Sequence, residues 1–566
     1  MPEYNYLDEV WRRLGTWGRY QSFQIFLQLT SVLSESIHLM VIVFIGYRPP
    51  YQCAEVENIT SRYEVLSNSS VTTRYGACHI DVLLNGTNHT IMELSPCPTG
   101  YTYGLQKDRT FVTEWDLVCE GAERAEVSQM LMMIGQMVGA AFLPQLSDKY
   151  GRKIVLVTSQ IVLFSSGIGA ALLPTFTCYA IMRFICGVTH QGMAMARAVM
   201  SVEILPEESR YMAEVLGCTV WALGLCLIAP VAYVMQDLSW RYLYLVLSLI
   251  SIHSLLGFWT FDESVRWLLA NGKITEAKRI LRKAAKMNKV NEEEILEVVD
   301  HAGAIALKSK LLQGDNQTQS INGKELTGHS TDVLPKYTVW TLFTRRRIAI
   351  ITLIMTYTWL VNSLTYYGLS LSSASLPLDR FLSFFLLSLA ELPVALIEYF
   401  TFNRWGRKWL CIIFHAVAAL SLIAGTVANY LSDKPGAEVA LMIFFFIGKL
   451  SIAGSFSTIF LFTPELYPTN LRNVGIGFSS AAGRIGGMLA PFAGPLAEKV
   501  SWAPGAIFGV MCVSVALLLP LLPEPTGHEL PTTVEELEQW YKQHSGIKRR
   551  KPLNINNTAE LNDVKH

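Results

Sequence analysis

The feature that most constrains the fold is the gathering of apolar residues into blocks of about 20 residues, the length that a helix needs to cross the hydrocarbon core of a bilayer. Hydrophobic residues make up 51% of the 566-residue chain and charged residues only 16%. We count twelve such blocks, at 20–46, 124–146, 154–174, 178–202, 211–235, 239–261, 346–371, 377–402, 409–430, 439–463, 473–497 and 501–522. The sequence therefore predicts an all-α membrane protein with twelve transmembrane helices.

The charged segments predict which ends of the helices face the cytosol. Residues 1–19 are polar and mixed in charge, so we expect no secretory signal and expect the first span to act as its own signal anchor. Short basic segments recur at 148–153, 345–347, 404–408 and 548–551. The positive-inside rule places these segments in the cytosol, and twelve spans then place both termini there. The formal net charge is zero, which gives no indication of a nucleic-acid partner.

The segment 47–123 then falls outside the cell, and its composition agrees with an exterior location. It contains four cysteines, Cys53, Cys78, Cys97 and Cys119. We expect two disulfides there, and three pairings remain open. The segment also contains four N-glycosylation sequons, at Asn58, Asn68, Asn85 and Asn88.

The chain divides into two halves that echo one another. The sequence at 148–153 (DKYGRK) reappears at 403–408 (NRWGRK), and a Pro-Glu segment follows the fourth and the tenth span. Such parallel repeats are typical of a two-bundle rocking transporter with its substrate site between the halves. We predict a cytosolic N-terminus at 1–19, a six-helix bundle at 20–261 that includes the exterior loop 47–123, a cytosolic helical loop at 262–345, a second six-helix bundle at 346–523 and a cytosolic tail at 524–566.

An ordered set of motifs runs along nearly the whole chain. The motifs are 112–119 (VTEWDLVC), 146–153 (LSDKYGRK), 263–269 (ESVRWLL), 366–370 (YYGLS), 464–468 (PELYP) and 523–527 (PEPTG). With these motifs the chain resembles the major facilitator superfamily and, within it, the organic cation, carnitine and organic anion transporters (solute carrier family 22). The resemblance implies a secondary transporter at the plasma membrane that works by alternating access.

Arg484 is a permanent cation in the middle of the eleventh apolar block. It lies about twelve residues into the block, near the bilayer midplane at 1.5 Å per residue. Burial there costs on the order of 3 kcal/mol, so we expect the side chain to face the bundle interior. One interpretation is that Arg484 attracts the anionic group of a substrate; the alternative is an ion pair with a carboxylate of another span. An arginine at this place resembles the anion and carnitine transporters, whereas the cation transporters usually have an aspartate.

The resemblance also implies that several other residues, most of them aromatic, line the central cavity. They are Lys449, Phe456, Tyr366, Tyr367 and Trp221. Lys449 and Phe456 are two helical turns apart and share a face. Aromatic side chains can hold flat or cationic substrates by stacking and cation–π contact, although each of them alone would more often be core packing.

The eighth span departs from the anion-transporter pattern, because Ala395 stands where many of those proteins have a lysine. Glu391 and Glu398 share a face of this span. Either could balance Arg484 or bind an amine, and we assign Glu391 to the cavity and Glu398, nearer the cytosol, to a structural role.

Arg183, His190 and Arg197 lie at seven-residue intervals in the fourth span, with Gln191 beside them. One hypothesis is that this basic stripe draws anionic groups or protons along the pathway. The alternative is ion pairing of the stripe with Glu35, Glu203 or Glu214.

Charged residues at the inner ends of the helices resemble the clusters that latch major facilitator proteins in their outward-facing state. Gly151 and Gly406 permit tight turns there. We assign gating roles to Asp148, Gly151, Arg152, Lys153, Glu203 and Arg210 in the first half and to Arg404, Gly406, Arg407 and Glu465 in the second.

These residues predict a transporter of a small organic ion, with a carnitine-like zwitterion first, an organic anion next and an organic cation, with Arg484 structural, third. A membrane receptor or scaffold with this fold is the alternative from another class. No ATP-binding glycine loop, metal motif or nucleophile motif occurs in the sequence, so we predict neither an enzyme nor a cofactor. The expected partners are the substrate, the bilayer and a coupling ion, either Na⁺, H⁺ or an exchanged organic anion.

Overall fold

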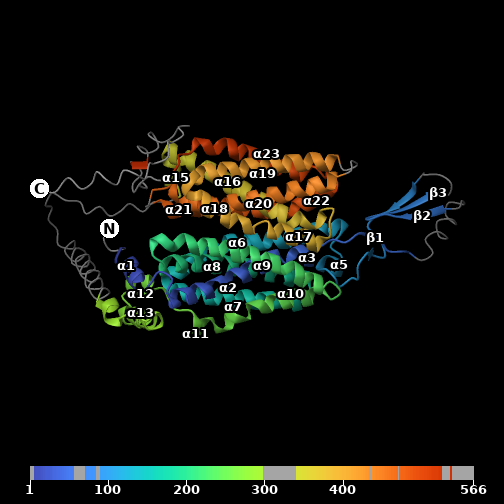
Figure 1. Cartoon of the computed structure of the whole chain (residues 1–566). Helices are drawn as coiled ribbons and strands as arrows, with labels where there is room; N and C mark the ends of the chain where they lie inside the picture. The colour runs from blue at the N-terminus through green and yellow to red at the C-terminus, as the bar shows by residue number, and fades with distance from the viewer. Residues whose placement is uncertain are drawn as a thin grey trace, which may run out of the picture.

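The structure is a computed structural model, and it describes residues 5–56, 71–84, 90–297, 339–431, 436–468, 471–525 and 536–537. Most of these residues are helical. The helices run side by side in one bundle, with β-strands at one end and three short helices at the other (Figure 1). We call these ends the β end, which carries strands β1–β5, and the α1 end, which carries α1, α12 and α13.

The first half of the bundle is built from long helices with short connections. Its elements are α1 (Asn5–Arg13), α2 (Arg19–Met40), α3 (Ile42–Ile45), α6 (Ala122–Tyr150), α7 (Arg152–Leu172), α8 (Phe176–Ile204), η2 (Glu207–Ser209), α9 (Arg210–Val234), α10 (Trp240–Leu249), η3 (Ile250–Leu256) and α11 (Gly257–Thr260). Two helices at the α1 end follow, α12 (Val265–Ala270) and α13 (Ile274–Asn288). The polar tract predicted near 313–332 lies outside the described residues.

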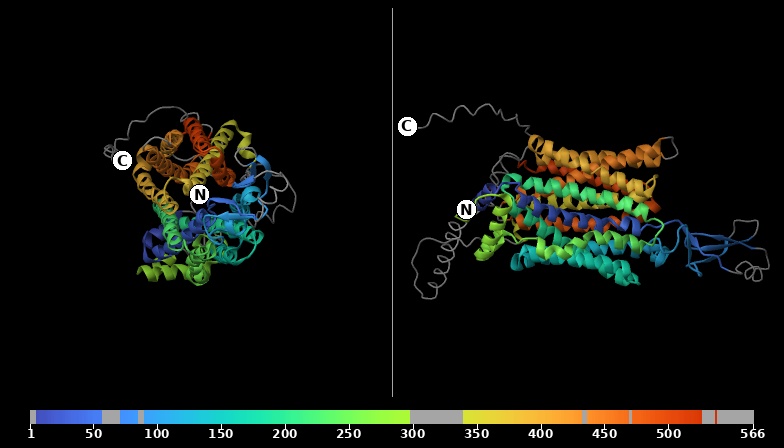
Figure 2. Two further views of the ribbon diagram at one scale, coloured as in Figure 1. Left: turned by 90° about the vertical axis from the view of Figure 1, so that its right-hand side faces the viewer. Right: turned by 60° about the horizontal axis from the view of Figure 1, so that its bottom comes forward.

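The second half repeats this construction. Its elements are α15 (Thr341–Thr344), α16 (Arg346–Leu371), η5 (Ser372–Ser375), α17 (Arg380–Leu389), α18 (Leu392–Trp405), α19 (Arg407–Tyr430), α20 (Ala437–Glu465), α21 (Arg472–Leu489), η6 (Ala490–Phe492), α22 (Ala493–Lys499), α23 (Ala503–Leu518) and η7 (Leu519–Leu521). Seen from the β end in the left panel of Figure 2, the helices of the two halves form adjoining groups.

Several predicted spans are interrupted. The first is divided between α2 and α3, the sixth between α10, η3 and α11, the eighth between α17 and α18, and the eleventh between α21, η6 and α22. Pro393 and Pro491 explain two of these breaks, because proline removes a backbone donor from the helical ladder. The break in the eighth span places Glu391 between two helices.

Ten helical segments of the described chain are long and apolar enough to cross a membrane, fewer than the twelve predicted spans. Helices α8 and α21 occupy the fourth and eleventh positions and are not among the ten. Both carry buried polar groups, including His190 and Ser480, in place of a continuous apolar surface.

The segment 47–123 forms two small antiparallel sheets. One pairs β1 (Tyr51–Cys53) with β5 (Tyr101–Tyr103), and the other has the order β2 (Val71–Tyr75), β3 (Ile80–Leu84), β4 (Thr90–Leu94). A short helix α5 (Phe111–Glu114) and a 3₁₀ turn η1 (Cys119–Gly121) lead into α6. The structure contains two disulfides, Cys53–Cys97 and Cys78–Cys119. All four sequon asparagines lie outside the described residues.

The two halves contact each other at the β end and in the middle of the bundle. Phe44 of α3 stacks on Phe381 of α17 with 5.4 Å between ring centroids, and the Arg380 guanidinium lies 4.4 Å from the ring centroid of Tyr47. In the middle, α21 packs against α6, and α17 and α18 pack against α9. These contacts place residues of both halves around one central region.

Candidate functional site

Arg484 lies in α21 and points across the interface between the halves. Its Nη1 donates a hydrogen bond to Oε1 of Gln136 at 2.6 Å, and its Nη2 donates to Oε1 of Gln191 at 2.7 Å. The side chain is half-buried, and it forms no ion pair with any residue that the structure describes. The alternative in which Arg484 pairs with a carboxylate of another span therefore does not describe this conformation.

The two acceptors of Arg484 come from the other half of the molecule. Gln136 lies on α6 and Gln191 on α8, and their exposed fractions are 0% and 2%. Nε2 of Gln136 also lies 3.3 Å from Nδ1 of His190. We noted Gln191 beside the basic stripe but did not identify Gln136. The signal that could have found it is an amide in the middle of an apolar block, which needs a partner inside a membrane.

Lys449 and Glu391 form a buried ion pair within the second half, with 2.9 Å between Nζ and Oε1. The hydroxyl of Tyr366 donates to the same carboxylate at 3.0 Å, and Nζ of Lys449 donates to Oγ of Ser370 at 2.6 Å. Nζ also lies 3.3 Å from the ring centroid of Tyr366. Of the alternatives left open for Glu391, the pairing with Arg484 is absent from this conformation, because Lys449 of α20 is the partner of Glu391.

The predicted aromatic residues do come together around this ion pair. Indole Nε1 of Trp221, on α9, donates to the hydroxyl of Tyr366 at 2.9 Å, which bonds the two halves a second time. The ring of Phe456 lies 5.5 Å from that of Tyr366 and 6.5 Å from that of Tyr367. Tyr367 in turn interacts through its hydroxyl with Arg484. The seven predicted substrate-binding residues therefore surround one central region.

The basic stripe of α8 is divided among different partners. Arg197 forms an ion pair with the buried Glu35 of α2 at 3.4 Å, one of the pairings that we weighed. Arg183 is completely buried and donates to the carbonyl of His38 at 2.8 Å and to Gln129. In the second half, Glu398 accepts hydrogen bonds from two hydroxyls of α20, Oγ of Ser457 at 2.8 Å and Oγ1 of Thr458 at 3.1 Å.

The predicted gating residues of the first half cluster at the turn between α6 and α7. Gly151 has a φ of 109°, a conformation that favours glycine. Arg152 lies 3.0 Å from Asp148 and 3.6 Å from Glu203, and Lys153 joins the cluster through its backbone N–H. Arg210 does not join this cluster, because it pairs with Asp8 of α1 at 3.0 Å.

Glu263 is a further member of this cluster to which we gave no role. Its carboxylate accepts hydrogen bonds from the backbone N–H groups of Arg152 and Lys153 at 2.9 and 3.1 Å, so it caps the N-terminus of α7. Burial raises the pKa of the Glu263 carboxyl, against the lowering effect of its backbone donors.

The second half repeats this arrangement at the turn between α18 and α19. Gly406 has a φ of 83°, and Glu524 accepts from the backbone N–H groups of Arg407 and Lys408 at 3.2 Å each. Arg407 lies 3.3 Å from Glu465, as expected. Arg404, to which we also assigned a gating role, is exposed and does not pair with Glu465 in this conformation.

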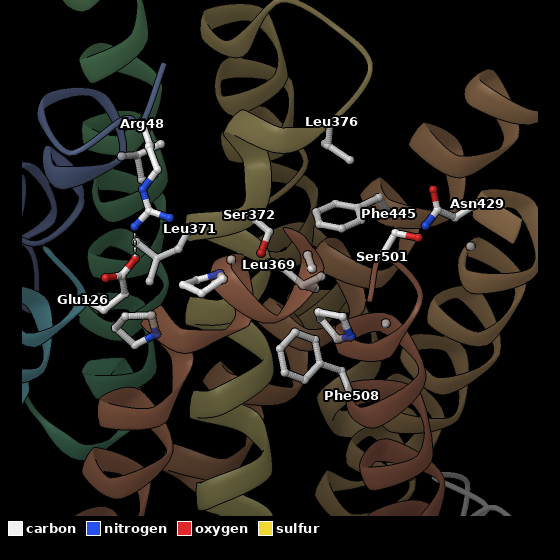
Figure 3. Close-up of a pocket in the computed structure, with 18 of the residues that line it drawn as sticks. Arg48, Glu126, Leu369, Leu371, Ser372, Leu376, Asn429, Phe445, Ser501 and Phe508 are labelled. Carbon is white, nitrogen blue, oxygen red and sulfur yellow. Dashed lines mark hydrogen bonds and ion pairs between the residues drawn. The ribbon is translucent and has the colours of Figure 1, made fainter. Parts of the chain in front are cut away.

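A cavity of about 510 Å³ lies at the β end and is lined by both halves. Figure 3 shows Arg48 and Glu126 on one wall, with 3.0 Å between Nη2 and Oε1, and Ser372 and Phe508 among the remaining lining residues. None of the predicted substrate-binding residues lines this cavity. It is therefore separate from the central region around Arg484. The described residues contain no cluster of three or more potential metal ligands.

The comparisons with known proteins agree with this architecture. The family profile described as "Sugar (and other) transporter" matches residues 102–531. The "Organic cation transporter protein" of Drosophila melanogaster is 33% identical and the match covers 95% of each chain, while "Organic anion transporter 3" of Mus musculus is 29% identical with 96% of each covered. "Solute carrier family 22 member 6-A" of Xenopus laevis is 28% identical, with 94% of each chain covered.

A solved structure shares the fold. It is the major facilitator superfamily proton:xylose symporter XylE, with a TM-score of 0.58 and 17% identity over 92% of this chain and 99% of XylE. The matching family and relatives are transporters and not enzymes, as the sequence predicted. The chain belongs to the sugar (and other) transporter family of the major facilitator superfamily and, within it, to the organic cation and organic anion transporters of solute carrier family 22.

Proposed function

We propose that the protein is a secondary transporter that moves small organic anions through the region around Arg484 by alternating access. The observation that carries this proposal is the environment of Arg484: a half-buried guanidinium at the interface of the halves whose partners, two amides and the Tyr367 hydroxyl, are neutral. A guanidinium in this setting keeps its full charge and retains donors for a carboxylate or sulfate.

The other charges near the centre support an anion over a cation. Lys449 and Glu391 neutralise each other, and Arg197 and Glu35 do the same in the first half. Arg183 also lacks a carboxylate partner among the described residues, but it is completely enclosed by protein. Arg484 is thus the accessible cation of the central region, and a substrate with an anionic group complements it.

A zwitterion such as carnitine is the second candidate. Its carboxylate would bind Arg484 in the same way, and its quaternary ammonium would need an aromatic face or a carboxylate. Tyr367 and Phe456 offer aromatic faces near Arg484, whereas Glu391 is already paired with Lys449. The charge balance for this reason favours an anion over the zwitterion that the sequence placed first.

The proposal includes the topology predicted from the sequence. In it, twelve helices cross the plasma membrane, α8 and α21 among them, both termini are cytosolic, and the glycosylated segment 47–123 is extracellular. The contact between Phe44 and Phe381 then joins the two halves on the extracellular side. The clusters at Gly151 and Gly406 would latch the cytosolic ends when the carrier turns outward.

Uptake into Xenopus oocytes tests the proposal with three labelled probes: an aromatic carboxylate, carnitine and tetraethylammonium. We expect the carboxylate to accumulate above uninjected cells, and Arg484→Ala to abolish that uptake at equal surface expression. Arg282→Ala is the control, because Arg282 is an exposed arginine of α13 that pairs with Glu292. Uptake of tetraethylammonium alone would show that Arg484 is structural. Binding of the labelled carboxylate to the surface of expressing cells, without uptake of any probe, would favour a receptor.

A further inference from the structure

We infer that Gln136 and Gln191 are positioning residues that set the anion preference of this carrier, because they hold Arg484 between the halves without neutralising it and yield it to an arriving substrate. This inference rests on the proposed function. It adds two residues of the first half to a site whose cation comes from the second half.

The geometry gives both amides one task. Each uses its carbonyl oxygen to accept from a different terminal nitrogen of Arg484, at 2.6 and 2.7 Å. Gln136 lies on α6 and Gln191 on α8, two helices that pack closely against each other, so the guanidinium is held from two sides. Both glutamines are buried, and their rotamers are therefore restricted by packing.

The orientation of Gln136 is fixed a second time by His190. Because Oε1 of Gln136 accepts from Arg484, its Nε2 must be the donor to Nδ1 of His190, at 3.3 Å. His190 then carries its proton on Nε2. The hydrogen bonds that link Arg484, Gln136 and His190 thus keep Oε1 of Gln136 directed at the guanidinium. A flipped amide would lose both of these contacts.

The neutrality of the amides is what makes the site reversible. A carboxylate adds the attraction between opposite charges and a bidentate geometry to its hydrogen bonds with a guanidinium, and a neutral amide offers neither, so a substrate carboxylate competes successfully for Arg484. A glutamate at either position would have almost the same shape as glutamine but would pair permanently with Arg484. The residue type at these two positions therefore decides whether Arg484 is available to a substrate or is held in a structural ion pair.

The competition also links binding to movement. The described side-chain hydrogen bonds between the halves in the middle of the bundle include the two that Arg484 donates to Gln136 and Gln191. They also include the one that Trp221 donates to Tyr366. When the anion takes Arg484, the first two are released. The loaded carrier then has fewer bonds between its halves than the empty one, and it can rearrange more readily.

The test compares two substitutions of Gln191 in oocyte uptake of the aromatic carboxylate. Gln191→Glu should raise the KM about 10- to 100-fold, because a buried carboxylate occupies Arg484. Gln191→Met should lower the KM about 2- to 10-fold, because a competing neutral acceptor is gone. A merely structural role predicts damage from both changes and cannot give opposite signs. Gln145→Glu is the matched control, since Gln145 lies on the exposed surface of α6.

The outcomes separate this inference from the proposal on which it rests. Surface expression is measured for each variant, and Gln136→Glu provides a second position if Gln191→Glu does not reach the surface. If Arg484→Ala abolishes uptake but both glutamate variants keep the wild-type KM, the amides do not control Arg484 and only this inference fails. An increase of KM in Gln191→Met would mean that the amide binds substrate itself, which also overturns the inference. Uptake that survives Arg484→Ala would overturn the proposed function instead.

Discussion

The buried ion pair between Lys449 and Glu391 gives the sharpest stability prediction. The two side chains have exposed fractions of only 2% and 7%, and they also make direct hydrogen bonds with Tyr366 and Ser370. Glu391→Gln keeps the shape of the side chain and an acceptor for Tyr366, but it removes the charge. We expect this change to lower the free energy of unfolding by about 3–5 kcal/mol, because it leaves a buried lysine without its counter-charge.

The magnitude follows from the separation of the charges. At 2.9 Å and an effective dielectric constant of about 20, the Coulomb attraction is about 6 kcal/mol. Desolvation of both ions opposes this attraction, so the pair itself contributes little net stability. Loss of one partner is therefore costly, whereas the double change Glu391→Leu with Lys449→Met should restore most of the lost free energy.

Equilibrium unfolding in mixed micelles measures Glu391→Gln and, beside it, the double-mutant cycle made of the wild type, Glu391→Leu, Lys449→Met and the two changes together. Glu9→Gln is the matched control, because Glu9 pairs with Arg13 at 3.0 Å on the exposed surface of α1, where such a pair contributes less than about 1 kcal/mol. If Glu391→Gln costs no more than the control, Lys449 and Glu391 do not form a structural pair. The Glu391 charge would then be available to a substrate amine, and the charge balance that favours an anion would be refuted.

Three further predictions concern the ends of the bundle. Gly151→Ala should lower the unfolding free energy by about 1–3 kcal/mol and slow transport, since a Cβ at φ 109° would clash with Oε2 of Glu263. Thermal unfolding and uptake measure the two effects. Replacement of both Cys53 and Cys97 by serine should destabilise the β-strand segment by about 2–5 kcal/mol, which protease susceptibility of that segment would report. Phe381→Ala should favour opening of the β end, because it removes the ring contacts of Phe381 there. A membrane-impermeant thiol reagent would then label a cysteine introduced at the β end faster than in the protein that retains Phe381. Equal labelling rates would contradict a closing role of Phe381.

The sequence predicted the helices better than their partners. Apolar blocks mark the helices because length and hydropathy are local properties, and the repeated GRK motifs located both tight turns at Gly151 and Gly406. Pairing depends instead on which faces of different helices meet. The seven-residue spacing predicted that Glu391 and Glu398 share a face. Only the packing of α20 beside that face shows that Lys449, and not Arg484, is the partner of Glu391. For the same reason the sequence left three disulfide pairings open, and the structure contains one of them.

The two helices that fall short as apolar spans, α8 and α21, are also the helices that hold Arg484 and Gln191. A guanidinium at the membrane midplane costs on the order of 3 kcal/mol on insertion scales. Two hydrogen bonds from a charged donor, at about 1.5–3 kcal/mol each, are enough to offset that cost in the empty carrier. A carboxylate partner would offset it as well, as Glu35 does for Arg197, but it would leave no charge for a substrate. The neutral acceptors Gln136 and Gln191 thus offset the cost of placing Arg484 in the membrane and leave its positive charge free to bind an anion.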